Sequence, residues 1–186
     1  MTSAAIVLAA GRASRFGGED GAKLLAPFRH RPLVRWAVDA AVEAGFDEVL
    51  VVTGAADLAD VLPAGTVTVP NPRWAEGQAT SLAAGLDAAE ARGHDVVVVG
   101  LGDQPLVTAA AWQAVASAES PIAVATYDGV RRNPVRLARE VWPEVDREGD
   151  EGARTLMRRR PELVAEVACA GDPVDVDTRE DLNRWS

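Results

Sequence analysis

The chain has 186 residues, of which 48% are hydrophobic and 25% charged, and its formal net charge is −9. Binding to nucleic acid depends on many phosphate contacts from Lys and Arg, so this acidic balance argues against a nucleic-acid partner. No apolar run approaches the roughly 18–20 residues of a membrane span, and no secretory leader is apparent. We therefore expect a cytoplasmic protein without a membrane partner, folded as one domain over residues 1–186.

Strand-like and helix-like patterns alternate along the chain. Apolar runs of strand length stand at residues 4–10, 48–52, 66–69, 95–101, 122–126, 130–137 and 163–168. Helical patterns stand at residues 32–42, 57–62, 81–92, 107–118 and 153–160, and Thr178 is placed to cap a last helix. This alternation predicts a three-layer, Rossmann-like α/β fold with a mostly parallel twisted sheet. The most apolar run, residues 95–101, is expected at its centre.

The first predicted strand ends at Gly11, and the loop after it combines glycine with positive charge. Arg12, Arg15 and Lys23 lie among four glycines. Backbone N–H groups and fixed cations at the carboxyl end of a strand suit the binding of phosphates. The loop does not read G-x-G-x-x-G and the second strand does not end in an acid, so a nicotinamide dinucleotide site is weakly supported.

A carboxylate follows the strand expected at the centre. Asp103 stands just after residues 95–101, and ligands of doubly wound sheets bind at the carboxyl ends of the strands. We therefore expect Asp103 beside the Gly11 loop. Carboxylate oxygens there can hold Mg²⁺, with phosphate oxygens as further ligands. Capping of the next helix is the alternative role for this side chain.

Longer motifs occur in order through nearly the whole chain. They are Leu8-Ala9-Ala10-Gly11-x-x-x-Arg15-Phe16-Gly17 with Lys23-Leu24-Leu25, Asn71-x-x-Trp74-x-x-Gly77-x-x-x-Ser81, Leu101-Gly102-Asp103-Gln104-Pro105, Gly149-Asp150-Glu151-Gly152-Ala153-Arg154 and Asp175-Val176-Asp177-Thr178. Together they resemble the MobA-like nucleoside triphosphate transferases. Within that family, Leu-Ala-Ala-Gly and Gly-Asp-Gln-Pro look most like the CTP:molybdopterin cytidylyltransferases, the MocA-like group.

The resemblance implies a set of site residues. Lys23, Arg15 and Asp103 would be catalytic, and Asp103 and Asp177 would hold Mg²⁺. The nucleotide-binding residues would be Leu8, Ala9, Ala10, Gly11, Arg12, Lys23, Asn71, Gly77, Ser81 and Asp103. The acceptor-binding residues would be Arg132, Asn133, Pro134 and Arg154.

The resemblance also implies a reaction and its partners. CMP would pass from CTP to the terminal phosphate of molybdopterin, with release of pyrophosphate, and a molybdoenzyme would receive the product. The family often has Gly-His-Pro-Val where residues 132–135 read Arg-Asn-Pro-Val, so the acceptor stays open. Three alternatives remain: a transferase with another base or phosphorylated acceptor (guanylyl or sugar-phosphate type), a non-catalytic cofactor-maturation protein, and a nicotine-blue-type NAD(P)H reductase.

Several other polar residues give weaker indications. Cys169 is the single cysteine, which excludes an intramolecular disulfide. His30 and His94 are interpreted as surface residues. Arg131 and Arg136 join Arg132 as candidates to receive an anionic second substrate, each with a solvated surface arginine as the alternative.

Overall fold

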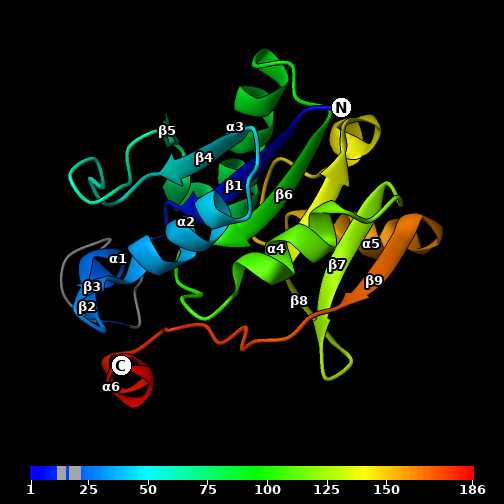
Figure 1. Cartoon of the computed structure of the whole chain (residues 1–186). Helices are drawn as coiled ribbons and strands as arrows, with labels where there is room; N and C mark the ends of the chain where they lie inside the picture. The colour runs from blue at the N-terminus through cyan, green and yellow to red at the C-terminus, as the bar shows by residue number, and fades with distance from the viewer. Residues whose placement is uncertain (12–15, 17–21) are drawn as a thin grey trace.

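The structure is a computed structural model, and it describes residues 1–11, 16 and 22–186. Within them, seven strands form the main sheet in the order β5-β4-β1-β6-β8-β7-β9 (Figure 1). The strands are β1 Ser3–Ala9, β4 Glu48–Thr53, β5 Val67–Pro70, β6 Val96–Leu101, β7 Ile122–Tyr127, β8 Val130–Ala138 and β9 Val164–Ala168. β8 runs antiparallel to β6 and β7, whereas the other neighbouring pairs are parallel. The predicted mostly parallel sheet is confirmed, with β6 at its centre.

Helices follow the strands in chain order. They are α1 Ala22–Leu25, α2 Leu33–Glu43, α3 Gln78–Ala91, α4 Ala109–Ala116, α5 Ala153–Arg159 and α6 Arg179–Trp185. Three short 3₁₀ helices lie at Trp74–Glu76, Arg139–Glu144 and Pro161–Leu163, and a small hairpin pairs β2 Pro27–Phe28 with β3 Arg31–Pro32. No helix in the described ranges is both long and apolar enough to cross a bilayer.

The prediction of a helix over residues 57–62 is wrong, because this segment forms turns. The Asp57 carboxylate accepts a hydrogen bond from the Ala59 backbone N–H at 3.0 Å, which closes a turn through the side chain. Pro63 follows at once and leaves no room for further helical turns. The β2–β3 hairpin and α1 carried no sequence signal of their own.

Strand β1 is buried on both faces, and its side chains alternate between two cores. Ile6 and Leu8 pack in the cluster that includes Leu86 of α3 and Leu156 of α5. The neighbouring Val7 packs in the cluster that includes residues of α2 and α4. Helices therefore cover both faces of the sheet (Figure 1), and the predicted three-layer arrangement is confirmed.

A third apolar cluster lies beside the carboxyl end of the sheet. Val176 is fully buried there with Phe28 and Leu33, and Trp36 and Trp185 pack against them. This cluster fastens the segment before α6 next to the loop that follows β6. The last helix itself begins as predicted, because Thr178 and Asp181 form a capping box.

His94, which was predicted at the surface, and Arg136, a candidate for an anionic second substrate, both lie inside the protein. His94 is 4% exposed, and its Nε2 lies 3.1 Å from the Glu48 carboxylate at the start of β4. Arg136 is 5% exposed, and its guanidinium donates to the backbone carbonyls of Ser120 and Pro121. Burial lowers the pKa of Arg136, although Glu140 partly offsets this. Arg136 therefore supports the β7–β8 region and does not lie in the cavities described below.

Candidate active site

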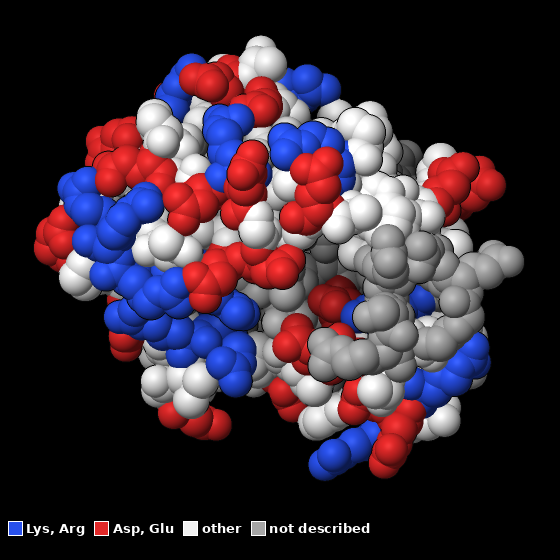
Figure 2. All heavy atoms as spheres, turned by 180° about the vertical axis from the view of Figure 1, so that it is seen from behind, with Lys and Arg blue, Asp and Glu red and all other residues white. Residues whose placement is uncertain are grey.

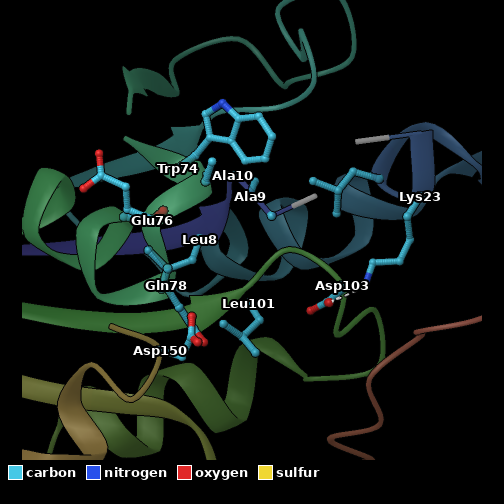
Figure 3. A pocket seen from close by; sticks show the side chains of 15 residues that line it. Leu8, Ala9, Ala10, Lys23, Trp74, Glu76, Gln78, Leu101, Asp103 and Asp150 are labelled. Atoms are coloured by element: carbon cyan, nitrogen blue, oxygen red, sulfur yellow. Dashed lines mark hydrogen bonds and ion pairs between the residues drawn. The ribbon is translucent and has the colours of Figure 1, made fainter. Parts of the chain in front are cut away.

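A cavity of about 530 Å³, here the first cavity, opens where β1 and β6 end (Figure 3). Its lining comes from the end of β1, from α1, from the 3₁₀ helix before α3 and the start of α3, from the end of β6 and the loop after it, and from the loop before α5. The lining residues are Leu8, Ala9, Ala10, Gly11, Lys23, Leu24, Trp74, Ala75, Glu76, Gly77, Gln78, Ser81, Leu101, Asp103 and Asp150. Cavities at this edge of a doubly wound sheet are where such folds bind ligands.

The charged centre of the first cavity is an ammonium group held between two carboxylates. Lys23 Nζ donates to Asp103 Oδ2 at 2.6 Å and to Asp177 Oδ1 at 3.2 Å. Lys23 is 6% exposed, whereas the Asp103 and Asp177 side chains keep 22% and 29% of their surface. Figure 3 shows the Lys23 side chain pointing toward Asp103, on the side of the cavity away from Glu76 and Gln78.

Tertiary contacts bring the two carboxylates together. The backbone N–H of Val176 donates to the Asp103 carbonyl at 3.0 Å, and the buried Val176 side chain holds this contact in place. On the other side, the Asp177 N–H donates to the Asp181 carboxylate of the α6 capping box at 3.2 Å. The contact of Val176, which precedes Asp177, and the hydrogen bond of the Asp177 N–H together fix the backbone at Asp177. Its carboxylate is thereby held close to the Lys23 ammonium group.

The electrostatic balance at Lys23 favours its charged form. Burial lowers the pKa of the ammonium and is the largest single effect. The charges and hydrogen bonds of Asp103 and Asp177 act in the opposite direction and together outweigh it, so the pKa of Lys23 is raised. Lys23 is therefore a permanent cation at neutral pH.

The same geometry fits a divalent cation. One oxygen of Asp103 and one of Asp177 contact the same ammonium group, that of Lys23. The two carboxylates are therefore close enough to share a metal ion in its place. No cluster of three or more His, Cys, Asp or Glu side chains suited to a metal occurs in the described part of the chain. Two carboxylates plus phosphate oxygens and water is the ligand set typical of Mg²⁺ at nucleotide sites.

The opposite wall of the first cavity depends on Gly77. This residue has φ +118°, and a Cβ on it would lie 2.4 Å from the Gly149 carbonyl oxygen. Ser81 lines the cavity, whereas Asn71 lies behind the wall. The Asn71 amide donates to the hydroxyls of Thr80 and Ser81 at 2.9 and 3.0 Å. Asn71 thus orients the start of α3.

A second cavity of about 530 Å³ adjoins the first, since Leu8, Gln78 and Leu101 line both. Its other lining residues come from β6 and the loop after it, from β8, α3 and α5, and from the loops before α5 and α6. They are Leu82, Val99, Gln104, Arg131, Arg132, Asn133, Val135, Glu151, Gly152, Ala153, Arg154, Met157, Arg158 and Asp175. Figure 2 shows Lys and Arg side chains gathered on one side of a central hollow in this face of the molecule.

The arginines of the second cavity are exposed and differ in their partners. Arg131 donates to Glu166 at 2.8 Å, and Arg158 pairs with Glu151. Arg132 and Arg154 line the cavity with Asn133. β8 carries an irregularity at this point, because Val135 and Arg132 pair with consecutive residues of β7. Such a bulge re-aims side chains.

The family model for the MobA-like NTP transferase domain matches residues 5–164. The chain belongs to this family. Among curated relatives of similar length, the nicotine blue oxidoreductase of Paenarthrobacter nicotinovorans is 33% identical and covers 96% of this chain and 94% of its own. The purine catabolism protein PucB of Bacillus subtilis is 30% identical, and the match covers 96% of this chain and 93% of PucB.

Solved structures agree with this assignment. Rv0371c of Mycobacterium tuberculosis H37Rv superposes with a TM-score of 0.83 at 32% identity, covering 100% of this chain and 97% of its own. A nucleotidyl transferase from Methanothermobacter thermautotroptrophicus has the same TM-score at 24% identity, covers 98% and 95%, and shares the fold. The fold and the MobA-like family together support a nucleotidyltransferase.

The structure brings most of the expected nucleotide-binding residues into one place. Ten residues were expected, and all but Arg12 and Asn71 line the first cavity: Leu8, Ala9, Ala10, Gly11, Lys23, Gly77, Ser81 and Asp103. Arg12 and Arg15 lie outside the described residues. Of the expected acceptor residues, Arg132, Asn133 and Arg154 line the second cavity, and Pro134 is buried beside it.

Several polar or aromatic lining residues were not singled out from the sequence as nucleotide or acceptor contacts, among them Trp74, Asp150, Gln104 and Asp175. Trp74 and Asp150 line the first cavity, and Gln104 and Asp175 line the second. All four stand inside the motifs that carry the family resemblance, which was the available signal. Burial is the main cause of the raised pKa of Asp175, followed by the charge of Asp103, while a hydrogen bond from Gln104 acts in the opposite direction.

Proposed function

We propose that this chain transfers CMP from CTP to the terminal phosphate of molybdopterin and releases pyrophosphate, in the maturation of a molybdenum cofactor. The observation that carries the proposal is the convergence of Lys23, Asp103 and Asp177 in a cavity that adjoins a second, arginine-lined cavity. One cavity suits the nucleotide and the other an anionic acceptor. The choice of CTP rests on the likeness of the Leu8–Gly11 stretch to the cytidylyltransferases.

In this proposal the triphosphate lies over the Gly11 loop. Lys23 neutralises phosphate oxygens, together with Arg15 and Arg12 of the loop. Gly11 is exposed, its φ lies outside the left-handed region, and no described heavy atom lies within 4 Å of a Cβ built on it. The described fold therefore does not itself require glycine here, which is consistent with close approach of a phosphate.

Asp103 and Asp177 would hold Mg²⁺. When bound, the ion neutralises charge on the α-phosphate and orients it. Lys23 now donates to both carboxylates, so we expect its ammonium to move onto phosphate oxygens when the nucleotide arrives. Such a move keeps the cation within the site and leaves the carboxylate oxygens for the metal.

In this proposal the acceptor would occupy the second cavity and attack the α-phosphorus from there. A terminal phosphate oxygen of molybdopterin forms the new P–O bond, while the bond to the β-phosphate breaks and its electron pair leaves with pyrophosphate. A phosphate monoester is already anionic near pH 7, so the step needs no general base. Arg132 and Arg154 would hold the charge of the acceptor, and catalysis is positioning plus charge stabilisation.

The test is pyrophosphate release with Mg²⁺ and molybdopterin, offering CTP, GTP, ATP and UTP in parallel. We expect release with CTP and a loss of about 10²-fold or more in kcat for Asp103→Asn, as for loss of one preorganised electrostatic group. Arg139→Met, which removes an exposed ion pair with Glu90, is the surface control. Release with another nucleotide corrects the base, and no release with any of the four refutes the proposal.

A second candidate is favoured by one relative, the nicotine blue oxidoreductase. A reductase of that kind would bind a nicotinamide cofactor. Two observations count against a reductase. β4 ends at Thr53 and has no acidic residue there to bind a ribose. The cluster of Lys23, Asp103 and Asp177, here the Lys23 cluster, instead suits the binding of phosphate and a metal ion. A titration with NADH and NADPH, followed by nicotinamide fluorescence, separates the two. Saturable binding would favour the reductase.

A further inference from the structure

The first cavity has two chemically different ends. Lys23 and Asp103 mark the end that suits phosphates and a metal ion. The other end lies at the start of α3 and at the loop before α5, where Glu76, Gln78 and Asp150 line the cavity. Figure 3 shows these three side chains on the side of the cavity away from Lys23. A nucleotide with its phosphates at Lys23 would therefore extend its base toward them.

Among the described residues, no side chain forms an ion pair or hydrogen bond with the Asp150 carboxylate. Glu76 is already engaged, since it accepts hydrogen bonds from Arg73 Nε and Nη2 at 3.0 and 2.7 Å. The other acidic residues of the stretch 144–151 each lie within ion-pair distance of an arginine: Glu144, Asp146, Glu148 and Glu151. Asp150 is exposed and lines the first cavity, so its carboxylate is available to a ligand there.

The position of Asp150 is set by the contact between its loop and the start of α3. The Ala79 N–H donates to the Gly149 carbonyl at 2.9 Å, which ties the loop to the helix. A Cβ on Gly77 would lie 2.8 Å from Asp150 Oδ1, so the carboxylate lies directly against this glycine. An ionised carboxylate accepts hydrogen bonds and cannot donate them. An acceptor is thereby held at the end of the cavity where the base would lie.

We propose that Asp150 accepts a hydrogen bond from the exocyclic amino group of the base and so selects cytosine over uracil. Cytosine carries an amino group at C4, which is a good donor to a carboxylate. Uracil carries a carbonyl oxygen at the same place, and this oxygen would face the carboxylate as a second acceptor. The inference rests on the proposed function in placing the nucleotide in the first cavity. Asp150 is in this sense a specificity-determining residue.

The experiment measures binding of nucleotides by calorimetry, with Mg²⁺ and without any acceptor. The probes are CTP, UTP and the triphosphate of pyrimidin-2-one riboside, which carries only hydrogen at C4, and GTP is compared with ITP, which lacks the 2-amino group. The proteins are the natural chain, Asp150→Asn, and Asp60→Asn as a matched control in the exposed turn after β4. Asp60 lines neither cavity. Loss of a negative charge changes the affinity for every triphosphate, so the ratio between two bases is the readout.

For the natural chain and Asp60→Asn, we expect roughly 10-fold tighter binding of CTP than of UTP, as for one hydrogen bond to a charged group, with the pyrimidin-2-one triphosphate between them. In Asp150→Asn the ratio of CTP to UTP affinity should fall below about 2-fold, because the amide can accept from cytosine or donate to uracil. A preference for GTP over ITP that Asp150→Asn abolishes would support the inference with guanine and would correct the base of the proposed function.

Loss of stability with an unchanged ratio in Asp150→Asn would give Asp150 only a structural role, as an acidic residue before α5, and would overturn the inference. Binding that is independent of the amino group in both base pairs, or no binding of any nucleotide, would overturn it as well. Pyrophosphate release with molybdopterin is scored separately. An Asp150-dependent base preference without release would refute the proposed function alone, and release without that preference would refute the inference alone.

Discussion

Replacing Lys23 by Met removes the cation that two carboxylates share and keeps the length of the side chain. Asp103 and Asp177 then lose the ammonium group that both of them hold, within a site where Lys23 itself is 6% exposed. Removing one partner of a buried ion pair costs about 3–5 kcal/mol. Because Asp103 and Asp177 are 22% and 29% exposed, water screens part of this repulsion, and we expect a loss of about 2–3 kcal/mol.

For a chain of this size, that loss lowers the Tm by roughly 5–10 °C. Urea unfolding at pH 7 measures the free energy directly, with Arg139→Met as a surface control expected to change it by less than about 1 kcal/mol. Pyrophosphate release should fall by about 10²-fold or more. A Lys23→Met protein as stable as Arg139→Met would refute the energetic role of the Lys23 cluster, and full turnover would refute its catalytic role.

The pH dependence of this difference follows from the raised pKa of Lys23. Folding favours the charged form of Lys23, so the free energy that Lys23 contributes to stability is fully present below its ordinary pKa of 10.5. The contribution is lost as pH rises through the raised pKa of the folded state. The stability difference between the natural chain and Lys23→Met should therefore be constant from neutral pH to about pH 10 and decline above it. A difference that shrinks between pH 7 and 9 would contradict this reasoning.

Three further predictions concern the same site. Without nucleotide, Lys23→Met should bind Mn²⁺ more tightly than the natural chain by electron paramagnetic resonance, because the ammonium no longer competes for the carboxylates; equal affinities would count against a shared cation site. Gly11→Ala should leave the Tm within about 1 °C and weaken CTP binding about 10-fold by calorimetry, as expected if only the ligand needs the space; a large fall in Tm would mean that the fold requires the glycine. Gly77→Ala should cost about 2–3 kcal/mol in urea unfolding, because its φ of +118° is strained for other residues; unchanged stability would show that the wall can move.

The local pattern of the chain was enough to predict most of the fold. Continuous apolar runs of strand length identify β1 and β6, and Thr178 marks the start of α6 as a capping residue. The failures are local as well. A side-chain turn at Asp57 replaces a short helix, and the β2–β3 hairpin is too short to leave a pattern.

The sequence predicted the site less completely than it predicted the fold. The glycine loop and Asp103 were predictable, because both follow strands whose carboxyl ends share one edge of a parallel sheet. Asn71 was expected as a ligand contact, yet its amide is used inside the protein by Thr80 and Ser81. His94 was expected at the surface, but it is buried beside Glu48. Polar residues in loops have no periodicity that reports burial.

The sequence by itself determined the order of strands and helices, the family and the kinds of side chain at the site. Only the tertiary structure decided which of them meet. Lys23 lies 80 residues from Asp103 and 154 from Asp177 along the chain, and the three converge because Val176 docks in a separate apolar cluster. The Gln104 amide nitrogen likewise meets its acceptors, Pro173 and Asp175, only in the folded chain. Such contacts follow from packing between distant segments, which no local pattern encodes.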